Sequence, residues 1–175
     1  MPKCVRHISY DDTQALQELD LFDQAVETEK SPFTETFVTA ASPGILSTTF
    51  FRDENHPDYA SDAEYIYALA KQLKQEYELI VSRGHILQVD APDLALERQI
   101  MYVDRPVNEF LERVELHIDA LNLALTDIPP EKVRMHLCWG NWDGPHCDDI
   151  DLEPLLPLLY RARVGGLSVA FANPR

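Results

Sequence analysis

The sequence is poor in basic residues and in long apolar runs, and each shortage excludes a class of protein. Only 15 Lys and Arg residues stand against 30 Asp and Glu residues, a net charge of -15, whereas nucleic acids and anionic membranes are bound by clustered basic side chains. No stretch approaches the roughly eighteen apolar residues of a membrane-spanning helix, and the first residues lack the apolar core of a secretory signal. We therefore expect a cytoplasmic protein with neither nucleic-acid nor membrane partners.

Cysteine is scarce, and glycine is missing from the places where nucleotide-binding motifs need it. The three cysteines are an odd number without framework spacing, which favours reduced thiols over disulfides. The sequence contains no phosphate-binding glycine loop, no dinucleotide fingerprint and no nucleophile elbow. These absences argue against nucleotide chemistry and leave Cys138 free to bind a metal.

The sequence has the composition of one folded domain covering residues 1–175, with 45% hydrophobic and 26% charged residues and no repeat or linker. Short apolar runs alternate with amphipathic segments, which predicts an α/β fold with a parallel sheet covered by helices. The predicted strands are Val5–Tyr10, Thr36–Ala41, Ile86–Asp90, Arg134–Cys138 and Leu167–Phe171. The predicted helices are Asp12–Glu27, Ser61–Ser82, Pro106–Thr126 and Leu152–Arg163.

Two of these helices carry clear end signals. Ser61 is a capping residue with Glu64 three positions later, and Gly84 follows the end of the same segment. The segment that begins at Pro106 has an apolar stripe that includes His117, and two prolines stop it after Asp127. The segment from Phe51 to Ala60 is a longer loop, at the strand end where α/β folds bind ligands.

His136 and Cys138 are the most informative residues, because side chains two positions apart on a strand share one face. Imidazole nitrogen and thiolate sulfur are ligands that zinc prefers, so the pair predicts half of a zinc site. The alternative is a hydrogen-bonded histidine and a small buried cysteine, both of which are common in protein cores.

Other polar residues follow the strand ends. Asp90 ends an apolar strand, where its carboxylate is placed to hold a substrate ammonium group or, alternatively, to cap a helix. Asp93 has the same alternatives, with capping favoured. The turn that begins at Ser42 brings the backbone near a ligand or is a plain turn. The run from His146 to Asp149 suits the start of the following helix better than a second metal site.

Four segments of the sequence carry a specific pattern: Phe37–Gly44, Leu87–Ala95, Met135–His146 and Ala172–Arg175. In order and spacing they resemble the cobalamin-independent methionine synthase family, especially its short bacterial members that have only the catalytic domain. The resemblance implies a (β/α)8 barrel, of which this chain supplies the middle strands. It also implies that zinc binds the thiol of homocysteine, which then attacks a methyl group carried by a folate.

Residue by residue, the resemblance makes His136 and Cys138 metal ligands and Asp90 the acidic residue that holds the substrate amino group, with Ser42 as a further substrate-binding residue. Ala170 stands where the family has a glutamate ligand, and a further cysteine ligand is expected beyond the last residue. Thr48 lies near the place of the aromatic residue that contacts folate. The resemblance therefore predicts a partial barrel, a fragment or degenerate copy, with two of four zinc ligands.

These observations predict a zinc-dependent methyltransferase-like domain that takes a small-molecule thiol and a methyl donor. An alkyltransferase acting on coenzyme M within the same superfamily is an alternative. A second alternative is a catalytically inactive remnant that binds a partner or nothing. A zinc-free decarboxylase of the uroporphyrinogen type leaves the spacing of His136 and Cys138 unexplained. Exposed strand edges would favour a homo-oligomer that completes the barrel.

Overall fold

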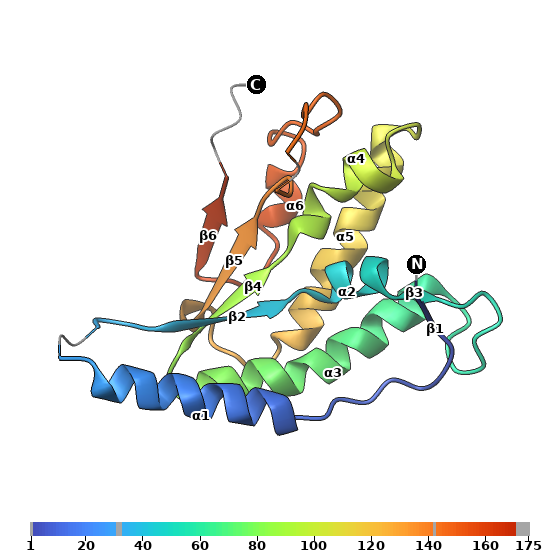
Figure 1. Cartoon of the computed structure of the whole chain (residues 1–175). Helices are drawn as coiled ribbons and strands as arrows, with labels where there is room; N and C mark the ends of the chain where they lie inside the picture. The colour runs from blue at the N-terminus through green and yellow to red at the C-terminus, as the bar shows by residue number, and fades with distance from the viewer. Residues whose placement is uncertain (1, 31–32, 142, 171–175) are drawn as a thin grey trace.

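A four-stranded parallel sheet forms the centre of the computed structural model, which describes residues 2–30, 33–141 and 143–170. The strand order is β2-β4-β5-β6 (Figure 1). The strands span Phe37–Ala41 (β2), Ile86–Asp90 (β4), Val133–Leu137 (β5) and Gly166–Val169 (β6). A separate pair, β1 (Lys3–Cys4) and β3 (Phe51–Arg52), is also parallel.

Helices connect the strands. The longer ones are α1 (Thr13–Thr28), α3 (Asp62–Ser82) and α5 (Val107–Ala124), and the shorter ones are α2 (Pro43–Thr49), α4 (Glu97–Met101) and α6 (Leu156–Leu159). Two single 3-10 turns, Pro92–Leu94 and Pro130–Lys132, precede α4 and β5. No helix within the described ranges has the length and apolar character that a membrane crossing requires.

The core lies between the sheet and the helices α3 and α5, which Figure 1 shows packed together along one face of the sheet. On that face the strands present apolar side chains such as Leu87, Val89 and Met135, all fully buried. Each such side chain stabilises the fold by roughly 1.5–3 kcal/mol. The apolar stripe predicted for α5 is confirmed, and it includes His117, which is 2% exposed.

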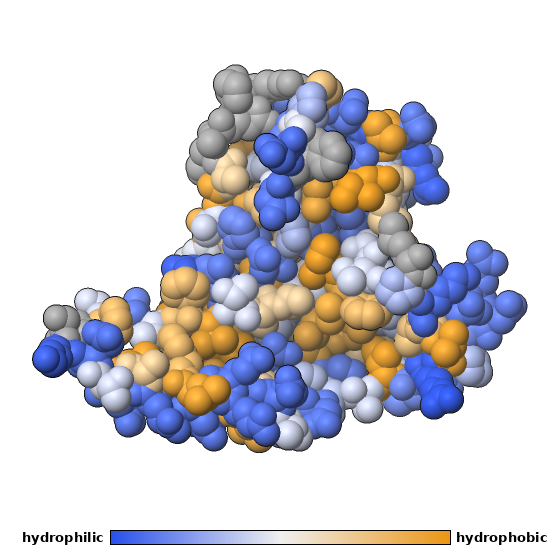
Figure 2. Space-filling model, in the orientation of Figure 1, coloured by the Kyte–Doolittle hydropathy of each residue, from blue (hydrophilic) through white to orange (hydrophobic). Residues whose placement is uncertain are grey.

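The opposite face of the sheet, called here the open face, is more exposed and largely polar. The register places Thr39, Gln88, Arg134 and Gly166 in one row across the four strands, and Ala41, Asp90, His136 and Ser168 in the next. Figure 2 shows the hydrophilic band of α1 at the foot of the molecule with apolar surface above it. The expectation of a parallel α/β sheet is confirmed, but the described residues form an open sheet and no closed barrel.

Two predicted elements are wrong. Residues 5–10 form no strand; instead the backbone N–H groups of Ile8 and Tyr10 donate to the side chains of Tyr59 and Gln72. The helix predicted over Leu152–Arg163 is reduced to the four residues of α6, because Pro154 and Pro157 interrupt the pattern of backbone N–H donors. Phe171, at the end of the last predicted strand, lies outside the described residues.

Candidate functional site

Asp90 and His136 are direct partners on neighbouring strands, at the carboxyl end of the sheet and on its open face. The carboxylate Oδ1 of Asp90 lies 3.8 Å from His136 Nε2, too far for a hydrogen bond. This oxygen is buried and has no hydrogen-bond partner in the described part of the chain. The two side chains thus lie side by side, and Asp90 keeps an unused acceptor there.

The tautomer of His136 follows from its other ring nitrogen. Nδ1 lies 3.1 Å from the backbone oxygen of Ser168, which can only accept a hydrogen bond. Nδ1 therefore carries the proton, and in the neutral ring the lone pair is on Nε2. Histidines that bind metals are commonly oriented by such a bond from the second ring nitrogen to a carbonyl.

Cys138 directly follows β5 and is half-buried. The sheet pairing continues there, because the N–H of Ala170 donates to Leu137 O at 3.1 Å, so alternation keeps Cys138 on the face of His136. Imidazole nitrogen and thiolate sulfur are ligands that zinc commonly has in proteins. A zinc ion needs about four ligands, however, and no three His, Cys, Asp or Glu side chains of the described residues come together as a metal site.

A second row of polar side chains lies on the open face, two residues before Asp90 and His136 along each strand. Arg134 Nε donates to Gln88 Oε1 at 2.6 Å, and Gln88 Nε2 donates to Thr39 Oγ1 at 3.5 Å. The guanidinium of Arg134 also lies 3.8 Å from the ring centroid of Phe37, a favourable cation–π position. The open face is therefore ordered by its own contacts from β2 to β5.

Ser42 begins α2 and joins a buried chain of hydrogen bonds behind the strand ends. Its hydroxyl accepts from the N–H of Ile45 and donates to Asp93 Oδ1 at 2.5 Å. The other oxygen of Asp93 accepts from His117 Nδ1 at 2.7 Å, and both of these side chains are almost fully buried. The carboxylate thus stands between serine and histidine. The hydroxyl of Ser42 contacts a carboxylate and not an imidazole, so these residues do not form a Ser-His-Asp nucleophilic triad.

The buried chain of hydrogen bonds corrects the prediction for Asp93 and shows what Ser42 contacts. Asp93 is not a helix cap; it is the central acceptor of the chain and is 1% exposed. The hydroxyl of Ser42 is fully engaged, and its N–H donates to the backbone oxygen of Asp90 at 3.0 Å. Ser42 is 2% exposed, so it positions α2 against the strand that carries Asp90.

Glu97 is the residue near the site that the sequence did not point to. It is 3% exposed, and neither carboxylate oxygen has a hydrogen-bond partner among the described residues. Burial, with the nearby charge of Asp93, raises the pKa of Glu97 to about 8, although Arg113 opposes the shift. A glutamate in the first turn of a short helix is normally exposed to solvent. The only sequence signal for burial of Glu97 is the apolar segment Leu94–Leu96 before it.

The other candidate residues make contacts that hold parts of the fold together. His146 Nδ1 bonds to the carboxylate of Asp149 within the same turn. The indole N–H of Trp139 donates to Ile150 O at 2.8 Å in the core. The loop from Phe51 to Ala60 folds against the first residues, where His56 Nε2 lies 3.0 Å from Arg6 O. Trp142 and the terminal Asn-Pro-Arg sequence lie outside the described residues.

Comparison with known proteins does not identify the chain: no protein-family model matches it, and no curated protein matches it.

Proposed function

We propose that this chain is a methyltransferase-type domain related to the cobalamin-independent methionine synthases, with its sheet forming part of a (β/α)8 barrel. The observation that carries the proposal is the pair at the carboxyl end of the sheet: His136 with its lone pair on Nε2, beside the unpaired Oδ1 of Asp90. In α/β folds the carboxyl ends of parallel strands are where ligands bind.

In this proposal Asp90 holds the ammonium group of an amino-acid thiol. The side chain of Asp90 is 43% exposed and its Oδ1 accepts no hydrogen bond from the described residues, so the carboxylate can form a charge-assisted pair with an ammonium donor at the strand end. The substrate sulfur would then lie toward His136 and Cys138. The sulfur forms a bond to the methyl carbon as the bond between that carbon and the donor nitrogen breaks, and the thiol proton ends on the donor.

His136 and Cys138 would hold zinc together with ligands from outside the described part of this chain. Zinc bound there would lower the pKa of the substrate thiol and so make its sulfur a nucleophile at neutral pH. The residues of this chain contribute orientation: Ser168 fixes the imidazole of His136, and Ser42 and Asp93 fix the helix beside Asp90.

A domain that binds an amino-acid thiol without methyl transfer is the second candidate. Ala170, at the position of the expected glutamate ligand, favours it, because a methyl side chain cannot coordinate a metal. Alkyl transfer to coenzyme M has no such support, since that thiol lacks the ammonium group that Asp90 would bind.

Zinc content and thiol binding test the proposal together. Wild-type protein purified with zinc should retain it, and His136→Ala and Cys138→Ala should each lose it. The control Cys4→Ala, which removes a thiol at β1, should retain the metal. Asp90→Asn should keep the zinc but bind homocysteine at least tenfold more weakly, by loss of a charge-assisted bond. A thiol without an amino group should bind both proteins equally.

The assay mixture of methyltetrahydrofolate and homocysteine then separates the two candidates. Methionine formed by the wild type and lost in His136→Ala supports methyl transfer. Zinc and homocysteine binding without methionine would support the binding domain. A wild type that takes up no zinc would contradict the metal-dependent reaction.

A further inference from the structure

Three arginines line one pocket among the helices. The pocket has a volume of about 380 Å³ and lies between α2, β3, the end of α4 and the first halves of α3 and α5 (Figure 1). The charged side chains that line it are Arg52, Arg105, Arg113, Glu54 and Asp62. Three of the 15 basic residues thus meet at one place in a chain with a net charge of -15. None of the lining residues belongs to the four-stranded sheet, so the pocket is separate from the site on the open face.

Arg113 has few hydrogen-bond partners, although its side chain is only 14% exposed. Its Nη2 donates weakly to Ser47 Oγ at 3.4 Å, and its Nη1 lies 3.9 Å from Asp62 Oδ2, too far for a hydrogen bond. The buried Nε has no partner among the described residues. A guanidinium has five N–H donors, and buried donors without acceptors are costly. Arg113 therefore has donors left for an acceptor that enters the pocket.

The other two arginines are fixed by contacts of their own. Arg52 donates from Nε to Asp62 Oδ1 at 3.0 Å and from Nη1 to backbone oxygens of the loop that follows β3. Arg105 has a largely exposed side chain and lies over the ring of Tyr102, 5.2 Å from its centroid. The pocket thus has one guanidinium with free donors, that of Arg113, and two that add positive charge beside it.

Charge and shape together favour one class of ligand. Three arginines against two carboxylates leave the lining with one positive charge. The buried carboxyl group of Glu97 near Arg113 adds little negative charge at neutral pH, because burial raises its pKa to about 8. The apolar and aromatic part of the lining is Phe51, Ile66, Met101 and Tyr102. A molecule with a single negative charge on an apolar or aromatic body matches both features.

We propose that this pocket binds a small organic carboxylate, whose two oxygens accept hydrogen bonds from the guanidinium of Arg113. Guanidinium and carboxylate groups commonly pair in this two-pronged way. The apolar body of the ligand would lie against Met101 and Tyr102. A phosphate dianion matches the pocket less well, because the lining has no positive charge to balance its second negative charge. The site goes beyond the proposed function, since it takes a different ligand on the helical side of the sheet.

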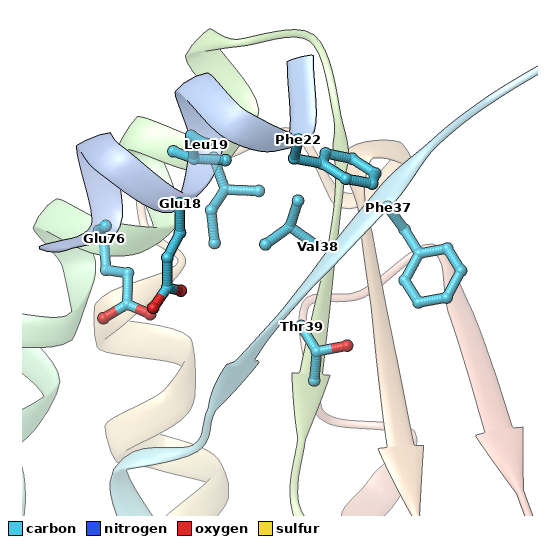
Figure 3. Close-up of a pocket in the computed structure, with 9 residues that line it drawn as sticks. Glu18, Leu19, Phe22, Phe37, Val38, Thr39 and Glu76 are labelled. Carbon is cyan, nitrogen blue, oxygen red and sulfur yellow. The ribbon is translucent and has the colours of Figure 1, made fainter. Parts of the chain in front are cut away.

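A second groove of about 280 Å³, between α1, β2 and α3, has the opposite charge. Figure 3 shows Leu19 and Phe22 of α1 facing Val38 of β2, with the carboxylates of Glu18 and Glu76 at one end. The charged residues that line this groove are both acidic, so they repel an anion. An organic carboxylate should therefore enter the arginine-lined pocket and not the groove, which serves as an internal reference.

Titration of the full chain with sodium benzoate tests the proposal, with calorimetry for the affinity and NMR of the backbone amides for the location. The wild type should bind benzoate saturably, with shift changes at Ser47, Met101 and Tyr102 and none at Leu19 or Val38. Benzamide has the same ring without the charge and should bind at least tenfold more weakly. Phenyl phosphate, as a dianion, should also bind more weakly than benzoate.

Three variants identify the residues that bind the carboxylate. Arg113→Gln should weaken benzoate binding at least tenfold, because the charge-assisted pair is lost. Asp62→Asn should strengthen the binding severalfold, because it removes a competing carboxylate beside Arg113; misfolding cannot produce such a gain. Arg161→Gln is the matched control and should bind as the wild type does, since Arg161 pairs with Glu115 and Asp119 outside the pocket. The NMR spectrum shows whether each variant folds.

Four results would overturn the inference. A wild type without saturable benzoate binding, or shift changes confined to the groove under α1, would exclude the site. Equal affinities for benzoate and benzamide would show that the charge of the ligand is not recognised. Affinities unchanged in both Arg113→Gln and Asp62→Asn would exclude Arg113 as the anchor. Tighter binding of phenyl phosphate than of benzoate would contradict the choice of a carboxylate.

Discussion

Glu97 is a buried carboxyl group whose pKa of about 8 makes the stability of the protein depend on pH. An unfolded glutamate has a pKa near 4.3, so between about pH 4 and pH 8 the folded chain keeps a proton that the unfolded chain has lost. The contribution of this group to stability is complete at the acid end of that window and is lost as the pH rises through 8.

The substitution Glu97→Gln removes this titration. We expect the variant to gain about 3–4 kcal/mol over the wild type between pH 5 and pH 8, measured by urea unfolding at both pH values. Glu112→Gln on the exposed side of α5 is the matched control and should follow the wild type. Wild type and Glu97→Gln with parallel pH profiles would show that Glu97 titrates normally.

Residues whose role depends on a distant partner were the hardest to predict. Strand alternation and strand ends are local patterns, so they predict that His136, Cys138 and Asp90 lie on one face near the strand ends. The sequence favours a cap for Asp93, because its partner His117 lies on a helix that only the tertiary fold brings near. The sequence does not point to Glu97 for the same reason, since nothing in its neighbours along the chain shows that α4 packs its first turn inward.

At the level of elements, α2 sits unusually close to the buried hydrogen-bond chain because its second residue is glycine. A Cβ at Gly44 would lie 1.9 Å from Asp93 Oδ2 and 2.4 Å from His117 Nδ1. The helix therefore reaches its position only with glycine there. Alanine at this position would push α2 away or break the bond between Asp93 and His117.

We expect Gly44→Ala to destabilise the fold by about 3 kcal/mol or more, because a buried charged hydrogen bond is lost. Gly84→Ala is the informative comparison: its φ is +92° but no atom lies within 4 Å, so the loss should be about 1 kcal/mol. Thermal unfolding of the two variants measures the difference. Equal losses would mean that backbone conformation, not the contact with Asp93, determines the effect.

Hydrophobic periodicity predicts the centres of the helices and strands better than their ends, and better than which face of the sheet the helices cover. Four of five strands and three of four helices lie where hydrophobic periodicity placed them. The failures have physical causes: residues 5–10 lack a strand partner, and prolines shorten the last helix. Apolar continuity predicted cover for the sheet, yet the open face is polar and exposed, because alternating residues such as Gln88 and Arg134 belong to it.

At the level of the whole molecule, charge opposes folding. The chain carries a net charge of -15, and its like charges repel at a range set by the Debye length, about 10 Å at 0.1 M salt. Salt should screen this repulsion. We expect the free energy of unfolding to rise between about 0.05 M and 0.5 M sodium chloride.

Urea unfolding across that range of salt measures the free energy. A free energy of unfolding that falls with salt would show that ion pairs stabilise the fold by more than like-charge repulsion destabilises it. Sodium sulfate at equal ionic strength is the control for screening, because it also strengthens apolar burial and should stabilise the fold further.

The row of Ala41, Asp90, His136 and Ser168 takes one residue from each strand, and tens of residues separate its members along the chain. Their alignment depends on the register of the sheet alone. The connections between the strands can therefore lengthen, shorten or change sequence without moving the row. Variation among relatives of this chain should accordingly fall in the connections, while the chemistry at the row would change through single substitutions within the strands.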